Sequence, residues 1–211
     1  MERPSTLRRH NARLNGERVY LRTLTPADAS KEYAGWLNDP TVNQYLETRS
    51  VTIPELRRYI EEKDESDHAI FFGIFWKNPT SQHDGDLPAE NRNERIDDPA
   101  SPRGKHIGNV KLEPVDFEKS AATMGILIGD KDYWGKGVGT EVTNLITDYA
   151  LSTLGLAEVN LGVMSTNVAA IRVYEKCGYD VDRIEEKSIH HDGILYDRVW
   201  MKKTVPSSVY S

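Results

Sequence analysis

Two spacings of apolar side chains alternate along the chain, one typical of strands and one typical of helices. Short runs rich in β-branched and aromatic residues predict strands at residues 19–24, 69–76, 107–113, 122–128, 158–164, 184–189 and 194–201. Apolar residues three and four positions apart predict helices that begin after Thr25, after Thr52, near Val138 and at Asn167. The resulting order, β-α-α-β-β-β-α-β-α-β-β, predicts one α/β domain with a mixed sheet.

Capping and turn residues stand at several of these predicted boundaries. Thr25-Pro26-Ala27-Asp28 and Thr52-Ile53-Pro54-Glu55 each place a cap before a proline and an acid, which is typical of helix starts. Gly178 follows the last predicted helix, where a left-handed residue ends many helices. Asp192-Gly193 lies between the last two strands and predicts a tight hairpin.

Three stretches have no such pattern, and we expect them to lie outside the folded core. Residues 1–17 are polar, carry four arginines and predict a flexible N-terminal lead-in. Residues 77–105 hold four of the ten prolines and almost no large apolar side chain, so they predict a polar insertion between two strands. The domain itself is expected at residues 18–203, followed by a C-terminal tail at 204–211.

Composition excludes several classes of function. The chain has 211 residues, and 27 Lys and Arg against 33 Asp and Glu give a net charge of −6, which argues against nucleic-acid binding. No apolar run approaches the roughly 20 residues of a membrane helix, and the first residues do not resemble a secretory signal. We therefore expect a cytoplasmic protein without a membrane partner. The single cysteine, Cys177, predicts neither an internal disulfide nor a zinc site, and His190-His191-Asp192 is interpreted as a solvated turn, so we expect no metal.

The segment with the most chemical information is glycine-rich. Tyr133 to Thr140 has the sequence YWGKGVGT and lies between a predicted strand and a predicted helix. Such a turn exposes consecutive backbone N–H groups beside a helix N-terminus, which favours binding of an anion such as a pyrophosphate. The spacing matches neither a P-loop nor a dinucleotide-binding fingerprint. On its own, the segment is equally consistent with a tight turn that binds nothing.

A second segment, Ser165 to Tyr179, follows the next predicted strand, and together the two resemble the GCN5-related N-acetyltransferase (GNAT) superfamily. The first signature of that family matches at Trp134, Gly137 and Gly139. Trp134 replaces the usual Arg or Gln, as in the branch that resembles ribosomal-protein alanine acetyltransferases. The second signature matches, in order and spacing, at Asn167, Ala170, Tyr174, Lys176, Gly178 and Tyr179. The resemblance covers residues 18–203 without the insertion, and it implies a GNAT-like acyl-CoA N-acyltransferase fold with a mixed central sheet, splayed strands and flanking helices.

The resemblance further implies acetyl-CoA as the acyl donor and direct transfer of the acetyl group to a primary amine. Backbone amides of the glycine-rich turn are expected to bind the pyrophosphate. The strand around Leu127 and Ile128 is expected to pair with the pantetheine arm, and Asn167 to hydrogen-bond that arm. The cofactor-binding residues implied in this way are Leu127, Ile128, Trp134, Gly135, Lys136, Gly137, Val138, Gly139, Thr140, Asn167 and Lys176. For Trp134 the alternative is packing in the core, and for Lys176 it is a solvated position.

Tyr174 is the residue that the resemblance implies as proton donor to the departing CoA thiolate. A thiol with a pKa near 8.5 and a phenol with a pKa near 10 are matched closely enough for proton transfer. The alternative is a core aromatic on the helix face that Tyr174 shares with Ile171. Cys177 has no neighbour that would lower its pKa, so we expect a small core residue rather than a nucleophile.

The acceptor amine is less well specified by the sequence. Residues 36–49 resemble both protein N-terminal alanine acetyltransferases and acetyltransferases of nucleotide-linked amino sugars. The run Tyr45-Leu46-Glu47, with His106 to Leu112 further along, is closer to the sugar group, so a nucleotide-linked amino sugar is the expected acceptor and a protein N-terminus the alternative. A non-catalytic acyl-CoA sensor is a third hypothesis, and both a monomer and a homodimer remain open.

An attacking amine must lose a proton, and three residues are candidates for the base that takes it. Glu47 is the first choice, because burial beside Tyr45 and Leu46 would raise its pKa toward a useful value. The alternative for Glu47 is an ion pair with Arg49. Glu113 precedes a proline at a strand end and is expected to face solvent, and His106 is equally consistent with the start of a strand.

Overall fold

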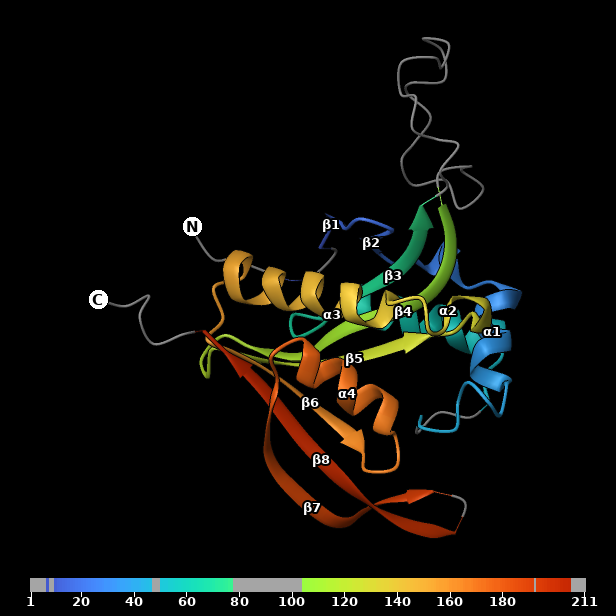
Figure 1. The fold of residues 1–211 in the computed structure, drawn as a ribbon. Coiled ribbons are helices and arrows are strands. Elements are labelled where there is room, and N and C mark those ends of the chain that lie inside the picture. The colour runs from blue at the N-terminus through green and yellow to red at the C-terminus, as the bar shows by residue number, and fades with distance from the viewer. Residues whose placement is uncertain (1–6, 8–9, 47–49, 78–103, 192, 206–211) are drawn as a thin grey trace.

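The computed structural model describes residues 7, 10–46, 50–77, 104–191 and 193–205, and these form one sheet with helices on both faces (Figure 1). The eight strands follow the order β1-β2-β3-β4-β5-β6-β8-β7 across the sheet. Only β5 and β6 run parallel; the other neighbours are antiparallel. The strands are β1 (Arg13–Asn15), β2 (Val19–Thr23), β3 (Ile70–Lys77), β4 (Gly104–Asp116), β5 (Ala121–Ile128), β6 (Glu158–Met164), β7 (Asp180–His191) and β8 (Ile194–Thr204).

The α-helices divide between the two faces of the sheet. They are α1 (Lys31–Asn38), α2 (Ile53–Asp64), α3 (Val138–Asp148) and α4 (Val168–Lys176). Successive side chains of a strand point to opposite faces, and β3 shows the division clearly. Phe72 belongs to the large core cluster that contains side chains of α3, whereas Phe71 belongs to a smaller cluster with α1 and α2. Each face therefore has its own core, and the single mixed sheet with flanking helices that the sequence predicts is confirmed.

The first helix begins later than predicted. Residues Pro26–Asp28 form a short 3₁₀ turn, and α1 starts at Lys31 with Ser30 as its cap, whose side chain accepts from the Tyr33 amide. The reason lies in Asp28, which is buried and accepts from both terminal nitrogens of Arg22 at 2.6 and 2.9 Å. The same carboxylate also accepts from the Thr25 amide, so the capping acid closes a separate turn instead of the start of α1.

The prediction that residues 1–17 are a flexible lead-in is wrong for their described part. Strand β1 pairs with β2, and the Arg13 guanidinium lies 3.9 Å from the centre of the Tyr20 ring. Leu7 is 2% exposed and belongs to the large core cluster. His10 forms a hydrogen bond to the hydroxyl of Tyr149, near the end of α3. The apolar residues Leu7, Ala12 and Leu14 follow neither a helical nor a strand spacing, which is why the sequence pattern did not predict this segment.

Other predicted boundaries fall partly outside the described residues. Of the expected insertion, residues 78–103 are not described, and its ends belong to β3 and β4. Of the expected tail, Thr204 ends β8 and the Val205 amide donates to the Ala157 carbonyl; residues 206–211 are not described. Within the described ranges, no helix is long and apolar enough to cross a bilayer.

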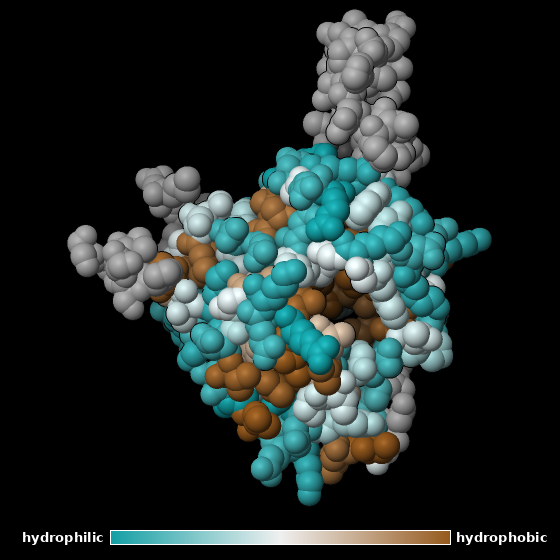
Figure 2. All heavy atoms as spheres, in the orientation of Figure 1, coloured by the Kyte–Doolittle hydropathy of each residue, from teal (hydrophilic) through white to brown (hydrophobic). Residues whose placement is uncertain are grey.

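The feature that positions the site is a separation of two neighbouring strands. β5 and β6 pair only between residues 121–123 and 158–160. Beyond that point β6 continues alongside β8, and the second half of β5 keeps only β4 as a neighbour. The predicted splayed strands are therefore present, and among the described strands none pairs with β5 on this side from Met124 to Ile128. The face viewed in Figure 1 is hollowed near its centre, and the walls of that hollow are apolar (Figure 2).

Candidate active site

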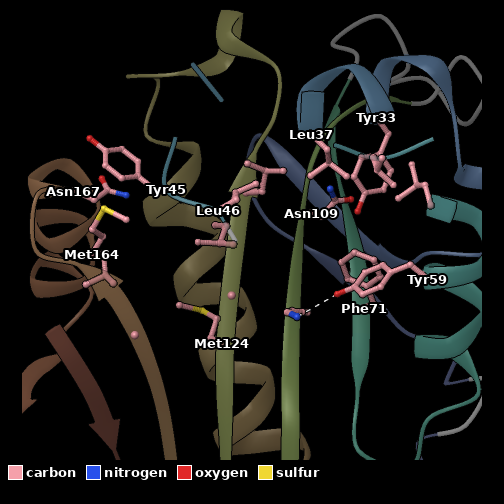
Figure 3. Close-up of a pocket in the computed structure, with 18 of the residues that line it drawn as sticks. Tyr33, Leu37, Tyr45, Leu46, Tyr59, Phe71, Asn109, Met124, Met164 and Asn167 are labelled. Atoms are coloured by element: carbon pink, nitrogen blue, oxygen red, sulfur yellow. Dashed lines mark hydrogen bonds between the residues drawn. The ribbon is translucent and has the colours of Figure 1, made fainter. Parts of the chain in front are cut away.

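A cavity of about 600 Å³ lies at the splayed strands and extends toward α1 and α2. Figure 3 shows Asn167 and Met164 on one side of it, Met124 at its centre, and Asn109, Tyr33 and Tyr59 on the other side. Its walls are mostly apolar or aromatic. The lining residues are Tyr33, Leu37, Tyr45, Leu46, Ser50, Val51, Glu55, Leu56, Tyr59, Phe71, Asn109, Lys111, Met124, Gly125, Ile126, Leu127, Gly162, Val163, Met164, Asn167 and Tyr174.

The glycine-rich turn has the backbone shape that an anion site needs. Gly135 and Gly137 adopt positive φ values of 71° and 78°, a region that side chains other than glycine rarely enter. Gly137 is the N-cap of α3, so the amides of Val138, Gly139 and Thr140 occupy the first helical turn, where no preceding helical carbonyl can accept from them. The partial positive charge of the helix N-terminus adds to these free donors. The turn therefore presents several donors to one anion.

A partly buried ion pair connects this turn to the residue before β2, and the sequence patterns did not indicate it. Glu141, in the first turn of α3, accepts from the Arg18 side chain and backbone amide, both at 2.9 Å, and from the Val19 amide at 3.2 Å. Arg18 also donates to the carbonyl of Lys136 at 2.5 Å. Partial burial acts to raise the pKa of Glu141, but the hydrogen bonds outweigh it and the pKa is lowered. The partners are 123 residues apart, so no local pattern marks them.

Trp134 connects the turn to the end of β5. Its indole N–H donates to the Ile128 carbonyl at 2.8 Å, while the ring remains 41% exposed. The core alternative for Trp134 does not hold, because its ring lies at the surface beside the turn. The Gly129 amide donates to the Ile107 carbonyl of β4, so by the alternation of the ladder the backbone of Leu127 faces β4 and that of Ile128 faces the open edge, where the bond from Trp134 occupies the Ile128 carbonyl. Leu127 also lines the cavity, and Ile128 does not.

The start and the middle of α4 each place a polar group in the cavity. Asn167 is the N-cap of α4, and its side-chain oxygen accepts from the Ala170 amide at 3.2 Å, which leaves its NH₂ group to donate. Tyr174 is 7% exposed and packs against Tyr179, with ring centres 6.0 Å apart. Burial raises the pKa of Tyr174 to about 12, so its phenol stays protonated at neutral pH. Tyr174 is both a core aromatic and a residue of the cavity wall.

The C-terminal half of α4 packs beside the glycine-rich turn. Cys177 is buried, and its Sγ lies 3.6 Å from the Thr140 carbonyl. Burial raises the pKa of the Cys177 thiol, in agreement with a packing role. Lys176, one residue earlier, is exposed and does not line the cavity.

The three expected bases differ sharply in their surroundings. Glu47 lies outside the described residues. Partial burial acts to raise the pKa of Glu113, but hydrogen bonds from Lys111 and Lys63 outweigh it, so the pKa is lowered and this carboxylate is a poor base. His106 does not line the cavity, and burial lowers its pKa. Its Nε2 lies 2.9 Å from the Gly108 carbonyl, which can only accept, so that nitrogen carries a proton and cannot take one.

Polar residues of the acceptor side escaped the sequence analysis. Asn109 and Lys111 alternate along β4, so both face the cavity, and Tyr59 reaches them from α2. Glu55 also lines the cavity; we interpreted it from the sequence only as part of a helix start, and its Oε2 does accept from the Thr52 amide. The alternation of polar residues within an otherwise apolar strand was the available signal.

Metal ligands were not expected, and the described residues form no group of three or more His, Cys, Asp or Glu that could hold an ion. His190 and His191 end β7, and Asp192 lies outside the described residues.

Comparison with known proteins gives a consistent result. The family model described as an acetyltransferase (GNAT) domain matches residues 18–180. A protein of Bacillus subtilis (strain 168) named "Probable N-acetyltransferase YjcK" is 28% identical over 192 residues, which cover 87% of this chain and 92% of that protein. The spermidine N(1)-acetyltransferase of Escherichia coli (strain K12) is 33% identical over 79 residues, which cover 37% of this chain and 42% of that enzyme.

Solved structures agree on the fold. The spermidine N-acetyltransferase from Vibrio cholerae in complex with CoA and spermine superposes with a TM-score of 0.71 at 19% identity, and the match covers 89% of this chain and 95% of that one. At this identity the similarity demonstrates a shared fold and leaves the acceptor to be argued from the cavity.

Proposed function

This chain belongs to the GNAT acetyltransferase family, and from that premise we propose that it transfers the acetyl group of acetyl-CoA to the primary amine of a nucleotide-linked amino sugar. The observation that carries the proposal is one continuous cavity. It joins Tyr174 and Asn167, on the side of the splayed strands, to Tyr59 and Lys111, on the side of α1 and α2.

The residues on the first side fit acetyl-CoA. The first-turn amides of α3 are free to bind the pyrophosphate, and the positive φ of Gly135 and Gly137 allows the backbone to turn toward it. The edge of β5 around Leu127 and Ile128 has backbone groups, those of Ile126 and the Ile128 amide, that face no strand among the described residues, as an extended pantetheine arm requires. The free NH₂ group of Asn167 can donate to the same arm. Lys136, within the turn, and Lys176, at the end of α4, are both exposed and are proposed to contact the phosphates.

Acetyl-CoA supplies a thioester. Its carbonyl carbon forms a C–N bond to the amine, and its C–S bond breaks. Tyr174 holds the proton that neutralises the departing sulfur, and its place in the cavity wall brings that proton to the reacting atoms. The amine must lose one proton, and we retain Glu47 as the proposed base because Leu46 and Ser50, the described residues on either side of positions 47–49, line the cavity.

The charge of the cavity favours a neutral or anionic amine over a polyamine. Polyamines carry several positive charges and need several carboxylates. Among the described lining residues, Glu55 is the one carboxylate and Lys111 is the one cation. Tyr45, 39% exposed at the cavity, offers an aromatic face for a nucleotide base or a sugar ring. These features support an amino sugar, although two relatives are named as spermidine acetyltransferases.

The test is an assay of CoA thiol release with acetyl-CoA and three acceptor panels. The panels are nucleotide-linked amino sugars, short peptides with an N-terminal alanine, and spermidine. We expect turnover with the amino sugars. Turnover with peptides alone or with spermidine alone would support the acetyltransferase activity and contradict the proposed acceptor. Tight binding of acetyl-CoA without turnover of any panel would favour the non-catalytic sensor.

A further inference from the structure

We propose that the acceptor half of the cavity contains a subsite for an anionic oxygen group of the amine substrate, a phosphate or a carboxylate, formed by Asn109, Lys111 and Tyr59. The proposal rests on the proposed function, because the subsite selects among the amines that the enzyme acetylates. It specifies how the enzyme would recognise the part of the acceptor that lies away from the reacting amine.

The first observation is a buried donor without a partner. Asn109 is 4% exposed and lines the cavity, and among the described residues nothing accepts from its Nδ2. Its Oδ1 accepts from His106 Nε2 at 3.2 Å. That nitrogen must carry its proton, because it also lies 2.9 Å from the Gly108 carbonyl, so the amide orientation is fixed. Buried polar groups in native proteins are almost always paired, so the unpaired NH₂ group indicates that a ligand oxygen belongs there.

The second observation is a set of further donors beside Asn109. The Lys111 ammonium has three protons, of which one is donated to the Tyr59 hydroxyl at 3.2 Å and one to Glu113 at 2.8 Å. The third is left for a ligand. The Tyr59 oxygen accepts from Lys111, as the dashed line in Figure 3 marks, so its own proton is also available. Asn109, Lys111 and Tyr59 together offer three hydrogen-bond donors and no free acceptor. This favours a ligand group that only accepts hydrogen bonds.

The third observation is the local charge. Glu113 is the common carboxylate of Lys63 and Lys111, so this cluster of two ammonium groups and one carboxylate has an excess of one positive charge. Hydrogen bonding to Glu113 keeps Lys111 protonated against the effect of its partial burial, since its pKa is raised. The other charged lining residue, Glu55, lies at the start of α2, where its Oε2 accepts from the Thr52 amide and hydroxyl. One negative charge on the ligand balances the cluster.

The strand register places the subsite beside the point of transfer. Asn109 and Lys111 are Cα partners of Leu127 and Gly125 on β5, so they lie one strand away from the edge proposed for the pantetheine arm. They are two residues apart on one face of β4, about 7 Å along the strand, and the long lysine side chain can close that distance around one oxyacid group. An acceptor can thus present its amine to β5 and its anionic group to β4.

The test compares acceptors that differ in one charge. An amino-sugar 1-phosphate is paired with the methyl glycoside of the same sugar, and a dipeptide is paired with its C-terminal amide. Binding of each compound in the presence of CoA is measured by calorimetry, and kcat and KM are measured with acetyl-CoA. The proteins are the wild type, Lys111→Met, Asn109→Leu and, as a control, Lys119→Met, whose side chain is 83% exposed in an ion pair with Asp116.

We expect wild type to bind the charged member of at least one pair about 10- to 100-fold more tightly, as hydrogen bonds to a charged group predict. Lys111→Met and Asn109→Leu are expected to remove that ratio through KM while the uncharged member is unaffected, and Lys119→Met to retain it. A preference in the sugar pair identifies phosphate as the occupant, and one in the dipeptide pair identifies carboxylate. Equal binding of both members in both pairs, or a ratio that survives Lys111→Met, overturns the subsite. Binding preference without turnover of any amine would instead overturn the proposed function alone.

Discussion

Tyr174 is buried and also reaches the cavity, and these two properties lead to a prediction at the residue scale. Replacing Tyr174 with Phe removes the proposed proton donor and keeps the ring that packs on Tyr179. We expect kcat to fall by about 10²- to 10⁴-fold with an unchanged dissociation constant for acetyl-CoA. Stopped assays of CoA thiol release and calorimetry measure the two quantities. A variant with wild-type kcat would reduce Tyr174 to a core aromatic.

Gly137 gives a second prediction at this scale. Its φ of 78° disfavours any side chain, and a Cβ there would lie 3.0 Å from Arg18 Nη1. We expect Gly137→Ala to destabilise the protein by about 1 kcal/mol or more and to weaken acetyl-CoA binding, because the first-turn amides of α3 would shift. Urea unfolding and calorimetry provide the measurements.

Gly35 provides the matched control for that substitution. It lies inside α1, is exposed, and a Cβ there would meet nothing within 4 Å. Gly35→Ala is expected to stabilise the protein by about 0.5–1 kcal/mol and to leave the dissociation constant for acetyl-CoA unchanged. If both substitutions had the same effect, the left-handed geometry of Gly137 would have no special role.

At the scale of elements, the sequence predicted most helices and strands because their signals are local. Periodicity and caps marked α2, and the sequence pattern Asp192-Gly193 marked the hairpin of β7 and β8. The start of α1 was misplaced, because whether Asp28 caps a helix or pairs with Arg22 depends on a strand that only the folded chain brings near. Strand β1 was missed because it has three residues and gains its stability from β2.

Leu7 tests whether the N-terminal segment is part of the folded unit. It is 2% exposed within the large core cluster, so Leu7→Ala is expected to lower the free energy of unfolding by about 2–5 kcal/mol. Leu195→Ala is the control, because Leu195 is 52% exposed and a change within about 0.5 kcal/mol is expected there. Urea denaturation followed by circular dichroism measures both. If both substitutions changed the free energy of unfolding by the same small amount, the N-terminal segment would not contribute to the folded core.

At the scale of the whole molecule, the site depends on relationships that no short motif contains. The two matched signatures predicted the acetyl-CoA side, where Gly137 and Asn167 stand at the starts of consecutive helices. The acceptor side is built from β4, α1 and α2, and the meaning of Asn109 depends on its neighbours in space. Lys111 likewise becomes informative only when Glu113 and Tyr59 are seen around it. Family signatures therefore predicted the reaction, and the acceptor had to be argued from tertiary contacts.

Stability at alkaline pH follows from tyrosines buried in both cores. Burial raises the pKa of Tyr33 in the smaller cluster and of Tyr149, Tyr174 and Tyr179 in the larger one, to about 12 for Tyr149 and Tyr174. In the unfolded chain these phenols have a pKa of about 10. Between about pH 10 and 12 the folded state therefore binds more protons than the unfolded state, and the free energy of unfolding decreases as pH rises. Below about pH 10 this contribution to stability is fully present.

Urea denaturation at several pH values between about 8 and 12 measures this dependence, and phenolate absorbance reports the ionisation. Lysine ion pairs weaken in the same range, so the informative comparison is wild type against Tyr174→Phe. The variant lacks one protonated group that the folded state protects. Its stability is expected to fall less steeply, by at most about 1.4 kcal/mol per pH unit. Identical slopes, or a wild-type-minus-variant difference in phenolate absorbance that rises near pH 10 in the folded protein, would show that Tyr174 titrates as if exposed, and its role as a proton donor held in the protonated form would then fail as well.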